Sequence, residues 1–337
     1  MGLRNRLSRD RSATAAVDRP RPDRLDPFLG DRELRSAYRA LVDGDWKKLE
    51  RFLLTSPKAW MFQGIATSEV LDIETVTFER WVDFKQTPRA RSFYAAVQIR
   101  DAFADRSRAQ AAHESEPLPA DEDHRFAARL KTAEEILYEV VTDRPAMPDP
   151  WVTLLVSGRG LSVDLEELRE RFENAHSRAA FRPDAALEYL ESLTKKWGGS
   201  NIATLDFARW LEAEATDDSA CRAALPMAHI ERGLHEYGRE NLARYLMQPE
   251  IVAELANGLL RFLQATESPA STEALPVLNA YALAMTADSA PTARLVIETY
   301  ARIENRPTLY PWSIYGEDIT DVFSEIQADQ LRFANRY

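Results

Sequence analysis

Apolar side chains recur every three or four residues along most of this 337-residue chain, which is the spacing of one face of an α-helix. The pattern is clearest over 122–143, where a continuous apolar face is formed by Leu130, Ala133, Leu137, Val140 and Val141. Alternation with a period of two is nearly absent, and 151–157 is the only ambiguous run. Because amphipathic helices must bury their apolar faces against one another, the spacing predicts an all-α protein.

Capping residues and breaks divide this pattern into short helices. Asp31 is expected to cap a first helix, which Gly44 ends, and Asp45 is expected to cap a second helix. Two short helices joined in this way form an antiparallel hairpin. Similar helix start and stop signals recur along the chain, including Asp149 before Pro150 and a stop at Gly158-Arg159-Gly160. They predict an irregular α-solenoid of antiparallel helical hairpins.

Two segments resemble tetratricopeptide helix pairs, namely 31–56 and 274–307. Small and apolar residues lie near the positions where the two helices of such a pair approach each other. The full tetratricopeptide signature is present in neither segment. The fold is therefore expected to be tetratricopeptide-like, with irregular packing of the hairpins.

Composition suggests four segments along the chain. Residues 1–28 are expected to be a disordered basic tail, and 29–110 are expected to form N-terminal helical hairpins. Residues 111–120 are polar and contain prolines, which is typical of a loop or linker. Residues 121–337 are expected to form a C-terminal helical-repeat region, either separate from 29–110 or in one continuous solenoid with it.

The net charge of −11 is unevenly distributed. Residues 1–24 hold seven arginines and three aspartates, so this segment is basic and the rest of the chain is strongly acidic. An acidic body repels polyanions, so we expect no nucleic-acid binding through it. No apolar run approaches the ~18–20 residues that span a bilayer, and the N-terminus lacks the apolar stretch of a secretory signal. These features predict a cytoplasmic protein without membrane insertion.

Residue types that carry catalysis or bind metals form no known motif here. Cys221 is the only cysteine, which excludes a multi-cysteine metal site, and the preceding Asp217 and Asp218 disfavour a reactive thiolate. These two aspartates lack the further carboxylate of a terpene-cyclase metal motif. Glu173 and His176 have the Glu-x-x-His spacing of a di-iron bundle but lack the second pair. We therefore expect no catalytic residues, no metal and no cofactor.

A set of motifs in the middle and at the end of the chain resembles a known family. The motifs are Pro150-Trp151, Gly160-Leu161, Arg171-Phe172-Glu173, Lys196-Trp197-Gly198-Gly199-Ser200, Phe207-Ala208-Arg209 and Pro311-Trp312. Over 75–315 the chain resembles an uncharacterised family of bacterial tetratricopeptide-like proteins that contain a domain of unknown function. The resemblance implies a helical-repeat scaffold that engages a protein partner, and it supplies no catalytic residues.

Seven tryptophans are spread through the chain, mostly near the ends of predicted helices. Most are expected to pack in the core or between hairpins, because each ring buries a large apolar area. A subset is expected to bind a partner, because tryptophan, tyrosine and arginine are enriched at interface hot spots. One candidate group lies near the glycine-rich turn, and the other is the segment 310–315, for which capping the last apolar face is the favoured role. The predicted partner-binding residues are Trp197, Arg209, Trp210, Tyr310 and Trp312.

Three functions remain open from the sequence alone. The leading hypothesis is a non-enzymatic interaction scaffold or adaptor, whose stacked helices form a groove for a protein or peptide of unknown identity. The alternative is a small-ligand sensor with a pocket between hairpins, which a buried concavity with converging arginine and aromatic side chains would favour. The third is an unrecognised all-α enzyme, which would show ionisable groups with shifted pKa values clustered in a cleft.

Overall fold

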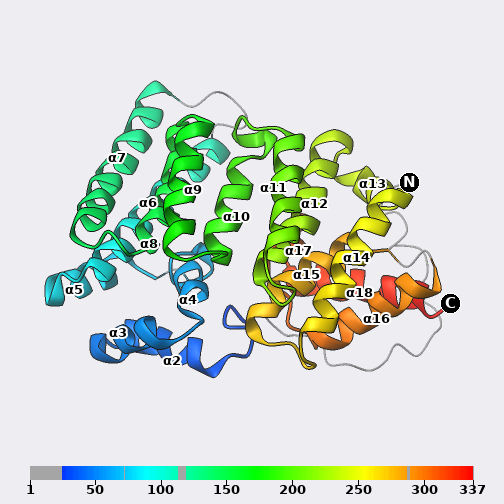
Figure 1. Ribbon diagram of the computed structural model, residues 1–337. Helices are drawn as coiled ribbons and strands as arrows, with labels where there is room; N and C mark the ends of the chain where they lie inside the picture. Colours follow the sequence, from blue (N-terminus) through cyan, green and yellow to red (C-terminus); the bar gives the residue numbers. More distant parts are fainter. Residues whose placement is uncertain (1–24, 72, 113–118, 287–288, 337) are drawn as a thin grey trace. The chain divides into compact units, whose positions relative to one another are not determined.

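The computed structural model describes residues 25–71, 73–112, 119–286 and 289–336 (Figure 1). In these ranges the regular structure is helical throughout, and they contain no β-strand. The predicted all-α class is therefore confirmed, and the ambiguous run 151–157 lies within a helix. Nowhere in the same ranges does a helix combine the length and the apolar character that crossing a membrane requires.

The helices divide into two compact units. The N-terminal unit, Asp31–Gly199, contains α2 (Arg32–Val42), α3 (Trp46–Thr55), α4 (Ala59–Ala66), η1 (Glu69–Leu71), α5 (Thr75–Lys85), α6 (Pro88–Ala112), α7 (Ala120–Asp143), α8 (Asp149–Leu161), α9 (Leu165–Arg178), α10 (Pro183–Ser192) and η2 (Lys195–Trp197). The C-terminal unit, Ser200–Tyr337 with the chain up to Gly30, contains α11 (Asn201–Glu214), η3 (Ala220–Ala223), α12 (Ala224–Tyr237), η4 (Arg239–Asn241), α13 (Leu242–Leu246), α14 (Pro249–Ala265), η5 (Thr272–Ala274), α15 (Leu275–Ala284), α16 (Ala290–Ile303), α17 (Leu309–Trp312) and α18 (Ile319–Ala334).

The first two helices begin at the capping residues that the sequence indicates. The carboxylate of Asp31 accepts hydrogen bonds from two backbone N–H groups of α2 at 2.8 and 3.0 Å. The carboxylate of Asp45 accepts one from the backbone N–H of Lys48 in α3 at 3.1 Å. Between the helices Gly44 has a φ of +74°, a conformation that side chains disfavour. Local capping and one glycine therefore account for this turn, and α2 and α3 pack against each other.

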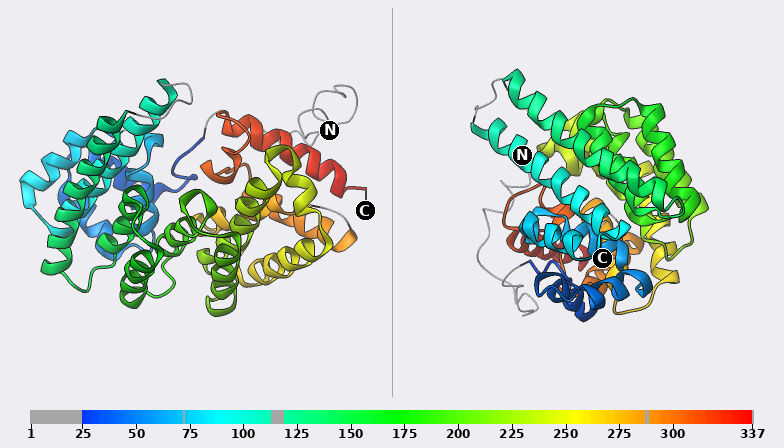
Figure 2. Two further views of the ribbon diagram at one scale, coloured as in Figure 1. Left: turned by 90° about the horizontal axis from the view of Figure 1, so that it is seen from above. Right: turned by 90° about the vertical axis from the view of Figure 1, so that its left-hand side faces the viewer.

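The long helices α6 and α7 lie along each other in the N-terminal unit (Figure 2). Of the apolar face predicted over 122–143, every residue except Val141 is fully buried. The buried side chains of α7 join those of α6 and α8, such as Ile99 and Leu154, in one apolar cluster. The helical spacing of the sequence thus identified the core of this unit.

Two of the segments expected from composition fall partly outside the described residues. Of the tail, 1–28, only 25–28 are described, and there Phe28 is buried and its backbone N–H donates to Asp26 at 3.1 Å. Of the expected linker, 111–120, the described residues are the end of α6 and the start of α7. The compact units divide elsewhere, after Gly30 and after Gly199, because α6 and α7 share one core and belong to the same unit.

The helix ends at Leu161, one residue beyond the stop expected at Gly158-Arg159-Gly160, but the glycines do not end it, because α8 runs through both. The left-handed residue that ends the helix is Ser162, with a φ of +56°. The glycines instead leave room for neighbouring helices. A Cβ on Gly160 would lie 2.5 Å from Cδ1 of Leu130 and 2.9 Å from Cζ of Phe103, so α8 can approach α6 and α7 only without a side chain there.

Replacing Gly160 with alanine is expected to lower the free energy of unfolding by about 1–3 kcal/mol, because the new methyl group overpacks the core. Gly64 in α4 is the matched control, since a Cβ there would have no heavy atom within 4 Å. Gly64→Ala is expected to raise the free energy of unfolding by up to about 1 kcal/mol through helix propensity. Urea unfolding measures both variants. Equal effects would show that α8 has space for a methyl group at Gly160.

Candidate functional site

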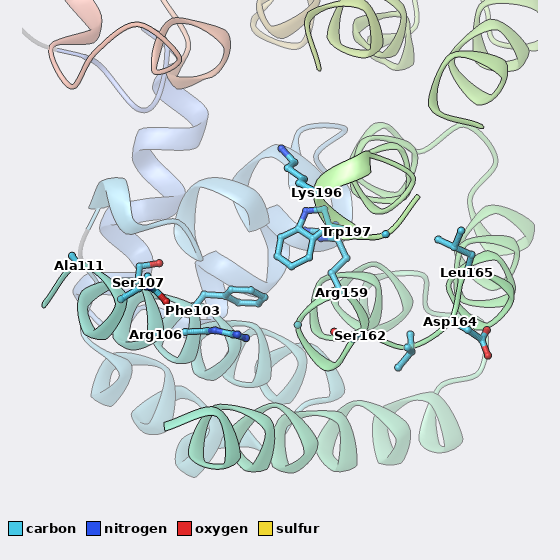
Figure 3. A pocket seen from close by; sticks show the side chains of 14 residues that line it. Phe103, Arg106, Ser107, Ala111, Arg159, Ser162, Asp164, Leu165, Lys196 and Trp197 are labelled. Carbon is cyan, nitrogen blue, oxygen red and sulfur yellow. The ribbon is translucent and has the colours of Figure 1, made fainter. Parts of the chain in front are cut away.

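A pocket in the N-terminal unit lies where the ends of α6 and α8 meet the start of α9 and η2 (Figure 3). It has a cavity volume of about 1190 Å³ and is open to solvent. Two aromatic and four charged side chains dominate its lining: Phe103, Trp197, Arg106, Arg159, Lys196 and Asp164. The pocket brings together chain segments that are far apart in the sequence, and it is the candidate functional site.

Trp197 and its neighbours form one wall of the pocket, and α10 holds them in place. Nε1 of Trp197 donates a hydrogen bond to Oε1 of Glu191 at 3.0 Å, and Nζ of Lys196 lies 2.8 Å from the same oxygen. The guanidinium of Arg159 donates to the backbone carbonyl of Glu188 at 2.8 Å and pairs with its carboxylate at 2.6 Å. This guanidinium lies 5.8 Å from the centre of the Trp197 ring, within cation–π range. Two glutamates of one helix therefore fix the ring and both cations.

Phe103 and Arg106, one turn apart on α6, form the other wall (Figure 3). The Phe103 ring makes edge-to-face contacts with Trp197 and Phe126, with centroid distances of 6.3 and 5.1 Å. Arg106 lies 4.5 Å from the centre of the Phe126 ring and 3.0 Å from the carboxylate of Asp123. Because Phe126 and Asp123 belong to α7, the packing of α7 on α6 positions this wall.

The lining of the pocket carries more positive than negative charge. Arg106, Arg159 and Lys196 supply three cations, and Asp164 is the one carboxylate among the described lining residues. Asp164 caps α9, because its carboxylate accepts a hydrogen bond from the backbone N–H of Glu167 at 2.8 Å. Each of the three cations also pairs with a carboxylate outside the lining, namely Asp123, Glu188 or Glu191, so the charges around the pocket are close to balanced.

Of the predicted partner-binding residues, Trp197 lines this pocket. Arg209 and Trp210 belong to α11 in the C-terminal unit, so the structure divides this predicted group between the two units. Arg209 makes two hydrogen bonds to the carboxylate of Glu254, at 2.7 and 3.0 Å. The Trp210 ring stacks on Phe207 at 5.5 Å and is 38% exposed, so it presents apolar surface to solvent.

The second predicted group, Tyr310 and Trp312, lies in α17. Trp312 is fully buried, and its Nε1 donates a hydrogen bond to Oδ1 of Asn279 at 2.7 Å. Its ring packs edge-to-face against Phe323 at 5.1 Å, while Tyr310 is half-buried. A side chain with no exposed surface cannot contact a partner, so Trp312 stabilises the core of the C-terminal unit, which is the favoured role for this segment.

Arg209 is the exposed end of a chain of polar contacts that leads into the C-terminal unit. Nε2 of His229 lies 3.1 Å from the Glu254 carboxylate, and Nδ1 lies 3.0 Å from the hydroxyl of Tyr245. An ionised carboxylate only accepts hydrogen bonds, so Nε2 carries the proton and Tyr245 donates to Nδ1. His229 and Tyr245 are 2% and 1% exposed, so this chain connects α11, α12, α13 and α14 and offers no reactive surface.

Acid is expected to weaken this chain of contacts. Burial lowers the pKa of His229 below 6.5, and the hydrogen bond from Arg209 lowers the pKa of Glu254 below 4.5. Both groups bind protons more weakly in the folded state, so their contribution to the free energy of unfolding is complete above about pH 7.5 and decreases as the pH falls. In the His229→Gln variant, the free energy of unfolding should therefore fall less between about pH 7.5 and pH 5.5 than it does in the wild type. Urea midpoints across this range test it, and an unchanged slope would assign the titration to other groups.

The sequence did not identify most of the residues that line the pocket. The glycine-rich turn indicated Trp197, but Phe103, Arg106 and Arg159 carried no local signal, because a cation on an amphipathic helix is usually a solvated residue. Cys221 is buried, as predicted for a small apolar side chain. Within the described ranges, no three His, Cys, Asp or Glu side chains are grouped so that they can hold a metal ion.

No family model, curated protein or solved structure matches this chain. The resemblance to bacterial tetratricopeptide-like proteins therefore stays a prediction based on the motifs. Inference about function rests on the geometry of the pocket itself.

Proposed function

We propose that this protein is a non-enzymatic binding module, of irregular tetratricopeptide-like architecture, that binds a segment of a partner protein in the pocket between α6, α8, α9 and η2. The observation that carries the proposal is the arrangement of Trp197, Phe103 and Arg159. These are aromatic and arginine side chains, the types enriched at interface hot spots. Glu191 and Glu188 hold Trp197 and Arg159 in place before any partner arrives. Such preorganisation reduces the entropy that binding would otherwise cost.

The size and exposure of the pocket favour a protein segment over a small ligand. Small-molecule sites usually enclose about 300–1,000 Å³ and bury most of the ligand. This pocket is larger, at about 1190 Å³, and is open to solvent. Two of its cations, Arg106 and Lys196, have side chains that are 42% and 47% exposed. An open pocket of this kind fits an extended chain that crosses it.

An enzymatic role has less support from the same geometry. The charged side chains that line the pocket form ion pairs or cap helices, as Arg106 does with Asp123 and Asp164 does at the start of α9. One pair of contacting groups with shifted pKa values, His229 and Tyr245, belongs to the C-terminal unit and is buried.

The proposal is tested by selecting peptides from a random display library on the full chain. Selected peptides should bind the wild-type protein and lose most of their affinity for Trp197→Ala, because that change removes the central aromatic side chain of the pocket. Trp210→Ala is the matched control, since Trp210 is also a partly exposed tryptophan but lies in the C-terminal unit. Circular dichroism verifies that both variants fold. Failure to enrich any peptide, or equal binding to Trp197→Ala, would contradict the proposal.

A further inference from the structure

We propose that the segment bound in this pocket is uncharged where it crosses the pocket and binds through two apolar side chains, an aromatic one against Trp197 and Phe103 and an aliphatic one against Leu165. This inference rests on the proposed function and specifies the chemistry of its partner. It follows from three features of the lining: its charges are paired, its two aromatic rings offer only apolar surface, and a further apolar side chain is exposed in another part of the pocket.

The charged side chains of the pocket leave little charge for a partner to match. Asp123, Glu188 and Glu191 pair with the three cations of the lining, at 3.0, 2.6 and 2.8 Å. Asp164 accepts a hydrogen bond from the backbone N–H of Glu167. A charged group on the partner would lose its water and would compete with these existing pairs. Uncharged side chains and backbone amides are therefore the groups that match this pocket.

Trp197 and Phe103 form the first apolar contact. The single N–H of the indole donates a hydrogen bond to Glu191 at 3.0 Å, so the ring has no further donor to offer. The two rings are nearly perpendicular, at 88°, with 6.3 Å between their centroids, and both side chains are half-buried. An aromatic side chain of the partner, packed edge-to-face against them, would bury apolar surface in the arrangement that aromatic pairs prefer.

Leu165 supplies the second apolar contact. It is the first residue of α9 and lines the pocket, and 38% of its surface is exposed. Figure 3 shows Leu165 beside Asp164 and apart from Trp197 and Phe103. One side chain of the partner cannot cover both apolar contacts, so a segment that uses both is elongated and carries two apolar residues.

Part of the lining is backbone. Gly160 and Gly198 both line the pocket, and a glycine does so through its main-chain atoms. A Cβ on Gly198 would have no heavy atom within 4 Å, so the space in front of this residue is open. A peptide backbone can approach closely there, and its N–H and C=O groups are uncharged hydrogen-bonding partners. This agrees with a segment whose contacts carry no charge.

The test uses the full chain and three peptide display libraries. Each library has one fixed tryptophan and one leucine, placed about two to six residues away on either side. The remaining residues are serine, asparagine, glutamine and glycine in the first library, aspartate and glutamate in the second, and lysine and arginine in the third. We expect the first library to yield the tightest binders. Fluorescence anisotropy should show that their Kd changes less than about threefold between about 50 and 500 mM salt.

Leu165→Ala should weaken binding of these peptides about tenfold, because the aliphatic contact is lost. Leu54→Ala is the matched control and should leave the Kd unchanged. Leu54 is also an exposed leucine on a helix of the N-terminal unit, and it is not among the described residues of the lining. Replacing the leucine of the peptide with alanine should weaken binding to the wild type but add little to the loss in Leu165→Ala, since both changes remove one contact. Circular dichroism verifies that both variants fold.

Equal or stronger enrichment from the acidic or basic library, or a Kd that changes more than about threefold with salt, would overturn the uncharged segment. Unchanged binding to Leu165→Ala, or losses that simply add, would overturn the second apolar contact. In each of these cases, peptides that still depend on Trp197 leave the proposed function standing. If no peptide from any library depends on Trp197, the proposed function itself fails.

Discussion

Asn279→Leu is expected to lower the free energy of unfolding by about 4 kcal/mol, because it leaves buried polar groups without partners. Asn279 is fully buried in α15. Its Oδ1 accepts hydrogen bonds from Nε1 of Trp312 at 2.7 Å and from the backbone N–H of Thr308 at 3.3 Å. Its Nδ2 donates to the carbonyls of Leu275 at 2.9 Å and Arg306 at 3.2 Å. One amide thus fixes the segment 306–312 on α15, and leucine can make none of these bonds.

Urea unfolding, followed by circular dichroism, measures this loss. Asn241→Leu is the matched control in the same unit, since Asn241 is exposed and, among the described residues, its amide donates to the carbonyl of Tyr237 alone, at 3.1 Å. The control should change the free energy of unfolding by less than about 1 kcal/mol. A similarly small effect of Asn279→Leu would show that Trp312 and Thr308 find other acceptors and that this amide is not needed for the packing of α17.

Helical class and helix starts were predictable because their causes are local. The spacing of apolar residues over 122–143 and the caps at Asp31 and Asp45 each act within a few residues of the chain. The glycines expected to end α8 do not end it, because glycine serves close packing as well as left-handed turns, and which use applies depends on neighbours such as Leu130. Those neighbours are distant in the sequence.

The pocket shows the same limit of local reasoning. Trp197 was predicted because a glycine-rich turn follows it immediately. Arg106 and Arg159 become site residues only because α6 and α8 end beside η2, and their cationic side chains look like ordinary surface residues in the sequence. For Trp312 the sequence left two roles open, partner contact and the favoured capping of the last apolar face, because residue type does not reveal that Asn279 and Phe323 contact it.

Arg222→Met is expected to lower the free energy of unfolding by about 3–5 kcal/mol at pH 8, because it removes one partner of a buried ion pair. Arg222 is fully buried, and its guanidinium contacts the carboxylates of Glu212 and Asp217. It also donates to the carbonyl of Thr216 at 3.0 Å. The Glu212 side chain is 13% exposed, so without Arg222 its negative charge would lie in a poorly solvated site. Among the described residues, the other cation close to Glu212 is Arg261, whose guanidinium lies 3.8 Å from the carboxylate.

The loss should depend on pH in a direction that identifies Glu212. Burial already raises the pKa of Glu212 above 4.5 although Arg222 is beside it, and removing Arg222 should raise this pKa further. The folded variant then binds a proton that the unfolded chain releases, so its stability falls as the pH rises from about 4.5 through the folded pKa. Urea midpoints at pH 5 and pH 8 should therefore show a larger deficit at pH 8.

The double variant Glu212→Gln/Arg222→Met separates the charge of Glu212 from the lost contacts of Arg222. This double variant has no ionisable group at position 212, so its free energy of unfolding should not fall between pH 5 and pH 8 in the way expected for Arg222→Met. It should also exceed that of Arg222→Met at pH 8, because an amide costs less to bury than an unpaired carboxylate. If Arg222→Met loses the same free energy at pH 5 and pH 8, the missing hydrogen bonds to Thr216 and its neighbours, rather than the stranded charge, account for the loss.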